Sequence, residues 1–403
     1  MVKLYSQLKR ALRQVVRPSP PPYSTQCVSL EPDGESRGRV LIAYILQPFL
    51  QSPGSPVPTS HTHFMESVLI ARAWLAEGFT VDVIDYRNPD FVPTVGYDYF
   101  VSARKHLKIV AERLGPACRK IAHFDTSHFA VNNRAAFQRL VELQLRRGVC
   151  LPASIRVIES NEAVEAMDIG VVLGNSVTAA TYAYGGKPLH CLPVPAIESS
   201  TWNRDKQFDD CRGRFLWLGS RGLVHKGLDL VLEAFADMPD MHLTVCGPLD
   251  QEPEFCRLYH RELSLPNVRA WGWVDVASAE FRELAARSLA LIYPSCGEGQ
   301  AGAVVNCIQH GLIPIISRES GIDVDGFGEV LSECSAIAIR DTIGRLNSEP
   351  DEELRRRSLA AMSHAESHHR YDAYTVRYRQ ILATIRANSK VDGSARVAPG
   401  PAQ

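Results

Sequence analysis

Residues 293–302 read Tyr-Pro-Ser-Cys-Gly-Glu-Gly-Gln-Ala-Gly, and they are the most informative stretch of this chain. The apolar run before it predicts a buried strand, and the run that ends at Gly311 predicts a helix. The turn between them carries one carboxylate, Glu298, among glycines that let backbone amides approach a ligand. Because a helix N-terminus favours anionic groups, the strand, turn and helix predict a ligand site.

A second stretch of the same kind lies upstream, where residues 219–227 read Gly-Ser-Arg-Gly-Leu-Val-His-Lys-Gly. It also follows an apolar run and precedes a predicted helix, but its turn carries two cations, Arg221 and Lys226. A cation at a helix N-terminus opposes the helix dipole. A bound anion therefore explains this pair better than a solvated surface does.

Length and composition bound the class of protein. The 403 residues predict two to three domains of about 150 residues each. The 44 basic and 45 acidic residues give a net charge of -1, which does not favour nucleic-acid binding. The ten cysteines form no C-x-x-C pair, and no apolar run reaches the roughly 18 to 20 residues that cross a bilayer. These features predict a cytoplasmic protein without a structural zinc site.

Short buried strands alternate with helices, which predicts an α/β fold with parallel sheets. In the first half, strands are expected at 40–45, 80–85, 120–124, 156–158 and 169–173, with a helix at 64–77. In the second half they are expected at 214–219, 242–247, 268–273, 289–294 and 313–317, with a long helical region at 352–386. Each half is expected to be a Rossmann-like, doubly wound domain.

These elements predict five parts of the chain. Residues 1–37 are expected to form a basic amphipathic helix and a proline-rich arm, and 38–200 a first Rossmann-like domain. Residues 201–365 are expected to form a second such domain, 366–387 helices that return to the first, and 388–403 a disordered tail. A dinucleotide-dependent dehydrogenase is disfavoured, because Gln-Pro-Phe-Leu at 47–50 follows the first strand where G-x-G-x-x-G would be required.

Three motifs in order carry a resemblance to a known family. They are Gly-x-Arg-x4-Lys-Gly at 219–227, Val-Cys-Gly-Pro at 245–248, and Pro-Ser-x-x-Glu-Gly-x-x-Gly at 294–302. Together they resemble the retaining group 1 (family 4 type) nucleotide-sugar glycosyltransferases. The resemblance implies a GT-B fold, in which two domains face a cleft and a C-terminal helix crosses back.

The resemblance implies roles for residues of the second half. Glu298 would contact the donor sugar or support its developing positive charge, and Arg221 and Lys226 would hold the diphosphate. The other donor-binding candidates are Gly219, Gly247, Gly299, Gln300, Ala301, Gly302 and Asn306. Asn306 stands where the family pattern Glu-x7-Glu places a second glutamate. No Asp-x-Asp motif lies in a turn suited to holding a divalent cation for the diphosphate, so we expect neither a metal nor another cofactor.

In the first half, the family's loop after strand one closes over the donor. Its usual glycine pair is replaced here by Ser-Pro-Gly-Ser-Pro at 52–56, and His61 and His63 follow as acceptor-side candidates. A polar residue at the end of the strand at 120–124 touches the donor sugar in the family. Since the register is open, His123, Asp125 and His128 share this catalytic role as candidates.

The resulting hypothesis is a metal-independent glycosyltransferase that acts with retention. A nucleotide-diphosphate sugar would be the donor, and a glycan, a lipid-linked molecule or a small molecule would be the acceptor. The basic amphipathic helix at residues 1–17 leaves two interpretations open: peripheral contact with the inner face of the membrane, or a helix that docks on the protein itself or is mobile. Two alternatives stay open: a non-catalytic relative that binds nucleotide sugars or glycans, and a GT-B epimerase of nucleotide sugars.

Overall fold

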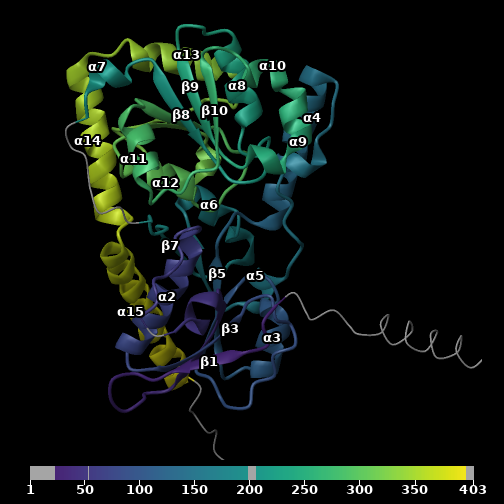
Figure 1. Ribbon diagram of the computed structural model, residues 1–403. Helices are drawn as coiled ribbons and strands as arrows, with labels where there is room; N and C mark the ends of the chain where they lie inside the picture. The colour runs from purple at the N-terminus through teal and green to yellow at the C-terminus, as the bar shows by residue number, and fades with distance from the viewer. Residues whose placement is uncertain (1–22, 53, 198–205, 396–403) are drawn as a thin grey trace, which may run out of the picture.

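Two sheets with helices on both faces form the molecule, and they lie one above the other in Figure 1. The computed structural model describes residues 23–52, 54–197 and 206–395. The first sheet has the strand order β1-β3-β2-β4-β5-β6-β7, and the second has β10-β9-β8-β11-β12-β13. All strand pairs are parallel except β1 with β3. The predicted α/β class with two doubly wound sheets is confirmed.

The first sheet begins with β1 (Cys27–Leu30) and β2 (Arg39–Tyr44), whose apolar run is almost fully buried. The remaining strands are β3 (Thr80–Asp85), β4 (Tyr99–Ala103), β5 (Arg119–Phe124), β6 (Ile169–Leu173) and β7 (Leu189–Leu192). The main helices around it are α2 (Thr62–Ala76), α3 (Leu107–Leu114), α4 (Phe129–Arg147), α5 (Ala163–Ala166) and α6 (Ser176–Ala180). We call this sheet and its helices the first domain.

The second domain is built on β8 (Arg214–Leu218), β9 (His242–Cys246), β10 (Val268–Gly272), β11 (Ala290–Tyr293), β12 (Ile313–Ile316) and β13 (Glu329–Val330). Its helices are α7 (Phe208–Cys211), α8 (Leu228–Ala236), α9 (Pro253–Leu258), α10 (His260–Leu263), α11 (Ala279–Ala286), α12 (Gly302–Ile308) and α13 (Ala336–Asn347). β8 and β11 are neighbours, so the turns that follow these two strands meet at the same edge of the sheet.

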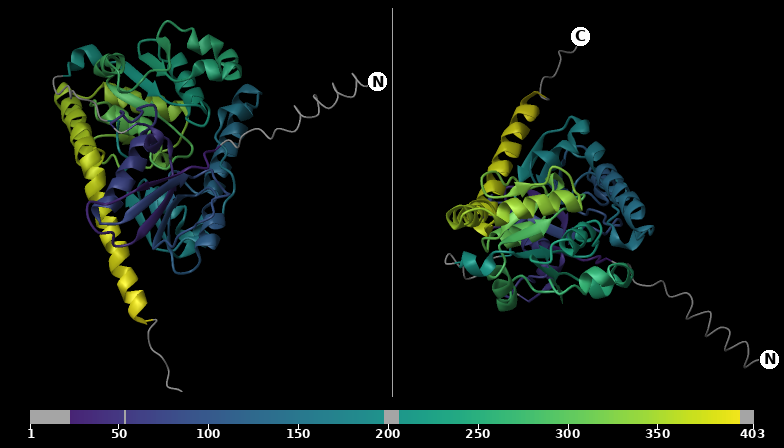
Figure 2. Two further views of the ribbon diagram at one scale, coloured as in Figure 1. Left: turned by 60° about the horizontal axis from the view of Figure 1, so that its bottom comes forward. Right: turned by 90° about the horizontal axis from the view of Figure 1, so that it is seen from above.

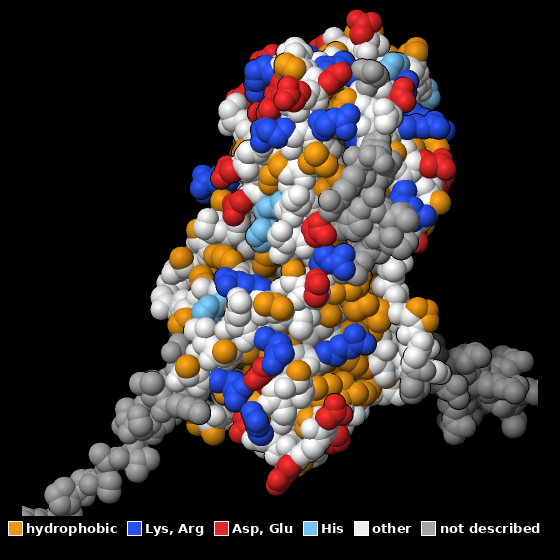
Figure 3. Space-filling view, turned by 90° about the vertical axis from the view of Figure 1, so that its left-hand side faces the viewer, with side chains coloured by type: hydrophobic (Ala, Val, Ile, Leu, Met, Phe, Trp, Pro, Cys, Tyr) orange, Lys and Arg blue, Asp and Glu red, His pale blue; other side chains and the backbone are white. Residues whose placement is uncertain are grey.

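Two C-terminal helices join the domains along one side. α14 (Asp351–His368) packs on the second domain, and α15 (Tyr371–Ala395) continues to the first, where it packs against α2. Tyr374 and Tyr378 of α15 are fully buried, and Arg379 and Arg386 form ion pairs with Glu77 at the end of α2. Figure 3 views this side, whose lower half mixes basic and hydrophobic side chains. The predicted helical return to the first domain is thus present.

Several sequence predictions need correction. β1 lies before the predicted start of the first domain at 38, and β4 was not predicted. α15 continues as helix to Ala395, although disorder was predicted from 388. The predicted helix within 1–17, the boundary at 200/201 and residues 396–403 lie outside the described residues. Within the described residues, no helix is long and apolar enough to span a bilayer.

The segment 156–158 is irregular rather than a strand, because side chains satisfy its backbone. Asn132 donates to the carbonyl of Arg156, and Asn133 bonds both backbone polar groups of Ile158. These asparagines belong to α4, so 156–158 follows that helix instead of joining a sheet.

Residues 129–156, which we call the interdomain arm, leave the first domain and pack on the second. Figure 1 shows α4 beside α9 and α10, and in Figure 2 the arm lies on the side opposite the C-terminal helices. Leu140, Leu143, Leu151 and Ile155 join the hydrophobic core of the second domain. Arg147 adds hydrogen bonds of 2.9 and 2.8 Å to the carboxylates of Glu233 and Glu262. The cleft is therefore bridged on two sides.

Two leucines of α4 test this packing. Leu143 is 0% exposed in the core of the second domain, whereas Leu145 is 82% exposed on the same helix. Leu143→Ala should lower the free energy of unfolding by about 2–5 kcal/mol, the usual cost of a cavity in a core. Urea denaturation followed by tryptophan fluorescence measures it, with Leu145→Ala as the control that should match the wild type. Equal stability of the two variants would contradict the packing of the arm.

Candidate active site

A cavity of about 360 Å³ lies between the two domains, at the carboxyl ends of the parallel strands. This is the edge at which α/β sheets usually bind ligands. Eleven of the residues predicted from the sequence line it: His61, His63, Asp125, Gly219, Arg221, Lys226, Gly247, Glu298, Gln300, Gly302 and Asn306. The structure thus brings the two turns of the second domain and two segments of the first around one space.

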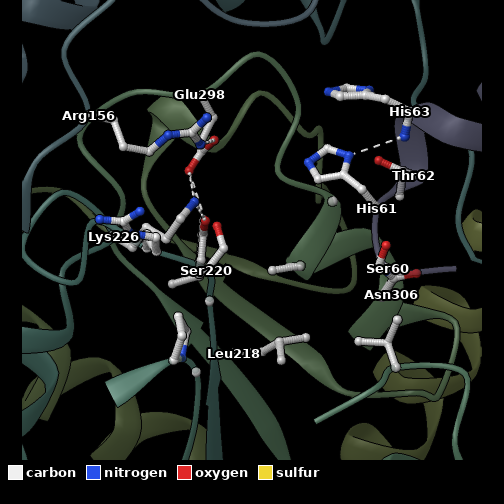
Figure 4. Close-up of a pocket in the computed structure, with 18 of the residues that line it drawn as sticks. Ser60, His61, Thr62, His63, Arg156, Leu218, Ser220, Lys226, Glu298 and Asn306 are labelled. Atoms are coloured by element: carbon white, nitrogen blue, oxygen red, sulfur yellow. Dashed lines mark hydrogen bonds and ion pairs between the residues drawn. The ribbon is translucent and has the colours of Figure 1, made fainter. Parts of the chain in front are cut away.

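The centre of the cavity is a buried ion pair between the two turns. The ammonium of Lys226 donates to Oε1 of Glu298 at 2.8 Å and to the hydroxyl of Tyr293 at 2.6 Å. Tyr293 and Ser295 also donate to that carboxylate, at 2.8 and 3.0 Å. Lys226 is 4% exposed and Glu298 is 9% exposed. Figure 4 shows the pair on the cavity wall, with the carboxylate directed toward Lys226 and Arg156.

The environment of this pair fixes its charges. Burial alone would raise the pKa of Glu298, but the charges of Lys226 and Arg156 lower it to about 2. Burial lowers the pKa of Lys226, and the charge of Glu298 opposes that shift. Above pH 4.5 the carboxylate is therefore fully ionised and held by its neighbours.

Glycine at two positions lets the turns meet. Gly227 has a φ of +74°, and a Cβ there would lie 2.5 Å from the carbonyl oxygen of Pro294. At Gly299 a Cβ would lie 2.6 Å from the carbonyl oxygen of Asp125, across the cleft. The first domain also holds the second turn directly, because the amide of Ser127 donates to the carbonyl of Glu298 at 3.1 Å. Close backbone packing thus places the carboxylate at the boundary of the domains.

Three arginines reach the cavity with different surroundings. Arg221 is exposed at its rim, on the turn that also carries Lys226. Arg104 forms an ion pair with Asp125, so this candidate carboxylate is already neutralised. Arg156 comes from the end of the interdomain arm, and its Nη1 lies 3.9 Å from Oε2 of Glu298. Arg104 and Arg156 were not predicted from the sequence, since no spacing links either of them to the motifs.

His123 does not reach the cavity. It is 1% exposed, and its Nε2 lies 2.9 Å from Oε1 of Glu66, a carboxylate in α2 that is 0% exposed. Glu66 also binds Nδ1 of His63 at 2.7 Å and the hydroxyls of Tyr44 and Tyr374. Glu66 was not predicted as a site residue, because in the sequence it is a single acidic residue within a helix. It orients His63, which lines the cavity, and its bond to Tyr374 joins α15 to α2.

Three other candidates lie outside the cavity. His128 lines a separate shallow hollow, where its Nε2 lies 3.3 Å from the hydroxyl of Tyr184. The carbonyl of Gly299 accepts a hydrogen bond from Thr178 at 2.7 Å, which makes this residue part of the domain contact. Ala301 is 2% exposed at the start of α12. The positions of these three residues therefore do not favour a direct role in the cavity.

Asn306 combines a position in the cavity with a structural bond. Its Oδ1 accepts the amide of Ile197 at 2.9 Å, so it holds the segment by which the chain leaves the first domain. Gln309 donates to the carbonyl of the same Ile197. The side chain at position 306 therefore has a structural role as a hydrogen-bond acceptor. Within the described residues, no group of three or more His, Cys, Asp or Glu side chains could hold a metal ion.

Comparison with solved structures identifies the class of fold. The sucrose-phosphate synthase of Thermosynechococcus elongatus aligns with 87% of this chain and 100% of its own, at a TM-score of 0.60 and 12% identity. HepE of Anabaena aligns with 86% of this chain and 100% of its own, at a TM-score of 0.55 and 11% identity. The fold is GT-B.

A family model matches the sequence of the second domain. Residues 212–347 match the model of the family described as glycosyl transferases, group 1, and this range contains both turns of the ion pair. The match is confined to the second domain, and it is to the family that the motifs resemble. No curated protein sequence matches it significantly.

The lowered pKa of Glu298 predicts a pH dependence of stability. A carboxyl whose folded-state pKa lies below its ordinary 4.5 stabilises the fold above pH 4.5, and this contribution is lost as the pH falls toward about 2. Between about pH 5 and 3, the free energy of unfolding should fall more steeply for the wild type than for Glu298→Gln. Urea denaturation at each pH measures this, with Glu352→Gln, at an exposed position of α14, as the control. Parallel curves for the wild type and Glu298→Gln would contradict the ion pair.

Proposed function

We propose that this glycosyltransferase moves a sugar from a nucleoside-diphosphate sugar to an acceptor hydroxyl with retention and without a metal ion. The observation that carries the proposal is the buried Lys226–Glu298 pair, which lies beside Arg221 in a cavity shared by both domains. A cation and a carboxylate at one point suit a donor that carries negative charge on its diphosphate and develops positive charge on its sugar. The alternatives of a binding-only relative or an epimerase have no comparable observation in their favour.

Binding of the donor would give Lys226 and Glu298 new partners. Its diphosphate competes with Glu298 for the ammonium of Lys226, and the guanidinium of Arg221 adds a second positive charge at the rim. Glu298 is then left facing the sugar, where Tyr293 and Ser295 hold its carboxylate. Because the charge on the sugar grows in the transition state, this carboxylate stabilises the transition state more than the bound donor.

The proposed transfer needs no general base from the protein. The bond between the sugar carbon C1 and the diphosphate oxygen breaks, and a bond from C1 to the acceptor oxygen forms on the same face. The acceptor proton passes to the departing diphosphate oxygen. Arg221 and Lys226 stabilise the negative charge on the diphosphate, which is the task that a divalent cation would otherwise perform.

The donor and acceptor are proposed from the cavity and from a structural neighbour. HepE of Anabaena was crystallised with UDP-glucose, which makes UDP-glucose the first donor to test here. The acceptor side would include His61 and His63, which contribute to the wall from the first domain. A glycan, a lipid-linked molecule or a small molecule remains our proposal for the acceptor. We place the reaction in the cytoplasm, with residues 1–17 as a peripheral contact to the inner face of the membrane.

Binding of nucleotides to wild type and Arg221→Ala tests the donor site. UDP, GDP, ADP and their glucose conjugates are titrated by isothermal calorimetry. We expect one nucleotide series to bind, and Arg221→Ala to weaken it by about 10-fold or more, since a hydrogen bond to a charged group contributes about 1.5–3 kcal/mol. Arg257→Ala, at an exposed position of α9 outside the cavity, is the matched control.

Turnover of the nucleotide that binds separates the proposal from its alternatives. Transfer should depend on an acceptor and persist in excess EDTA. Turnover without acceptor that interconverts two nucleotide sugars would favour the epimerase, and binding without any turnover would favour the binding-only relative. Loss of activity in EDTA, restored by Mg²⁺ or Mn²⁺, would contradict metal independence.

A further inference from the structure

We propose that Arg156 is a third cation for the donor diphosphate, carried to the phosphate-binding turn of the second domain by the interdomain arm. This inference rests on the proposed function and adds a substrate-binding residue from the first half of the chain. No motif in the sequence points to this arginine.

The stem of Arg156 lies on the turn that carries the other two cations. A Cβ added to Gly222 would come within 2.9 Å of Cγ of Arg156, so glycine at this position leaves room for the arginine stem. Gly222 directly follows Arg221 and precedes Lys226 by four residues. All three cations line the same cavity. Figure 4 shows Arg156 and Lys226 on the same side of the cavity, with Glu298 beside them.

The backbone of Arg156 is fixed by bonds to the second domain and to α4 of the interdomain arm. Its amide donates to Nδ1 of His225 at 3.4 Å, and its carbonyl accepts from Asn132 at 2.8 Å. Nε2 of His225 lies 2.7 Å from the carbonyl oxygen of Gly297. An imidazole that donates from Nε2 and accepts at Nδ1 is neutral, and burial lowers the pKa of His225 to about 4. One neutral histidine thus connects the arm, the basic turn and the turn of Glu298.

The guanidinium of Arg156 is available to a ligand. Its side chain is 54% exposed, and its approach of 3.9 Å to Glu298 is too long for a hydrogen bond. Its side chain makes no hydrogen bond to any residue in the described part of the chain. Arg104 also reaches the cavity from the first domain, but Asp125 neutralises it. Arg156 is therefore the first-domain cation best placed to bind an oxyanion in a bidentate manner.

The diphosphate is the part of the donor whose charge suits Arg156. Glu298 already accepts hydrogen bonds from Lys226, Tyr293 and Ser295 through one oxygen, Oε1. A diphosphate that takes Lys226 from this carboxylate would bind in the cavity that Arg221 and Arg156 also line. The fork of an arginine and the point charge of a lysine would then neutralise adjacent phosphate groups. The leaving group would be bound from both domains at once.

Comparison of a nucleoside diphosphate with its monophosphate and nucleoside tests this role. The probe is UDP, GDP or ADP, whichever binds the wild type, titrated by calorimetry together with the matching monophosphate and nucleoside. Arg156→Gln should weaken the diphosphate by about 10- to 100-fold and leave the nucleoside unchanged. Arg134→Gln, at an exposed position on the same arm, is the control and should match the wild type.

The outcomes separate this inference from the proposed function. If the wild type binds a diphosphate that Arg221→Ala loses and Arg156→Gln keeps, the role of Arg156 is overturned and the donor site stands. Equal weakening of diphosphate, monophosphate and nucleoside by Arg156→Gln would show a structural effect of the arm and would also overturn the role. If no nucleoside diphosphate binds the wild type, both the proposed function and this inference fail.

Discussion

The buried ion pair of Lys226 and Glu298 is the interaction on which the site depends. Two charges removed from water are costly unless hydrogen bonds satisfy them, and here Tyr293 and Ser295 supply those bonds. The pair joins the turn after β8 to the turn after β11, two neighbouring strands of one sheet. Two neighbouring strands of a parallel sheet thus bring the opposite charges together. An anionic ligand can then replace Glu298 as the partner of Lys226.

The position of this pair at the domain boundary explains why the connections between the domains matter. The amide of Ser127 and the hydroxyl of Thr178 hold the backbone of Glu298 and Gly299 from the first domain. The C-terminal helices and the interdomain arm bridge the cleft on opposite sides. The site is therefore built from both domains and bordered by the segments that connect them.

Sequence reasoning succeeded where local signals are strong. The glycine-bounded turns at 219–227 and 293–302 each follow an apolar strand, so their fold, their family and their meeting in one cavity could be predicted. It failed where a residue depends on distant partners. His123 is drawn to Glu66 of α2, and 156–158 follows the arm onto the second domain, although its apolar residues suggested a strand. No periodicity or spacing encodes such contacts.

The most direct measurement is a crystal structure of the protein with the nucleoside-diphosphate sugar that binds it. We expect Lys226 to leave Glu298, to which it now donates at 2.8 Å, and to donate to a phosphate oxygen instead. Glu298 should then lie against the sugar. A complex in which the Lys226–Glu298 pair stays intact while the diphosphate binds elsewhere would contradict this exchange of partners.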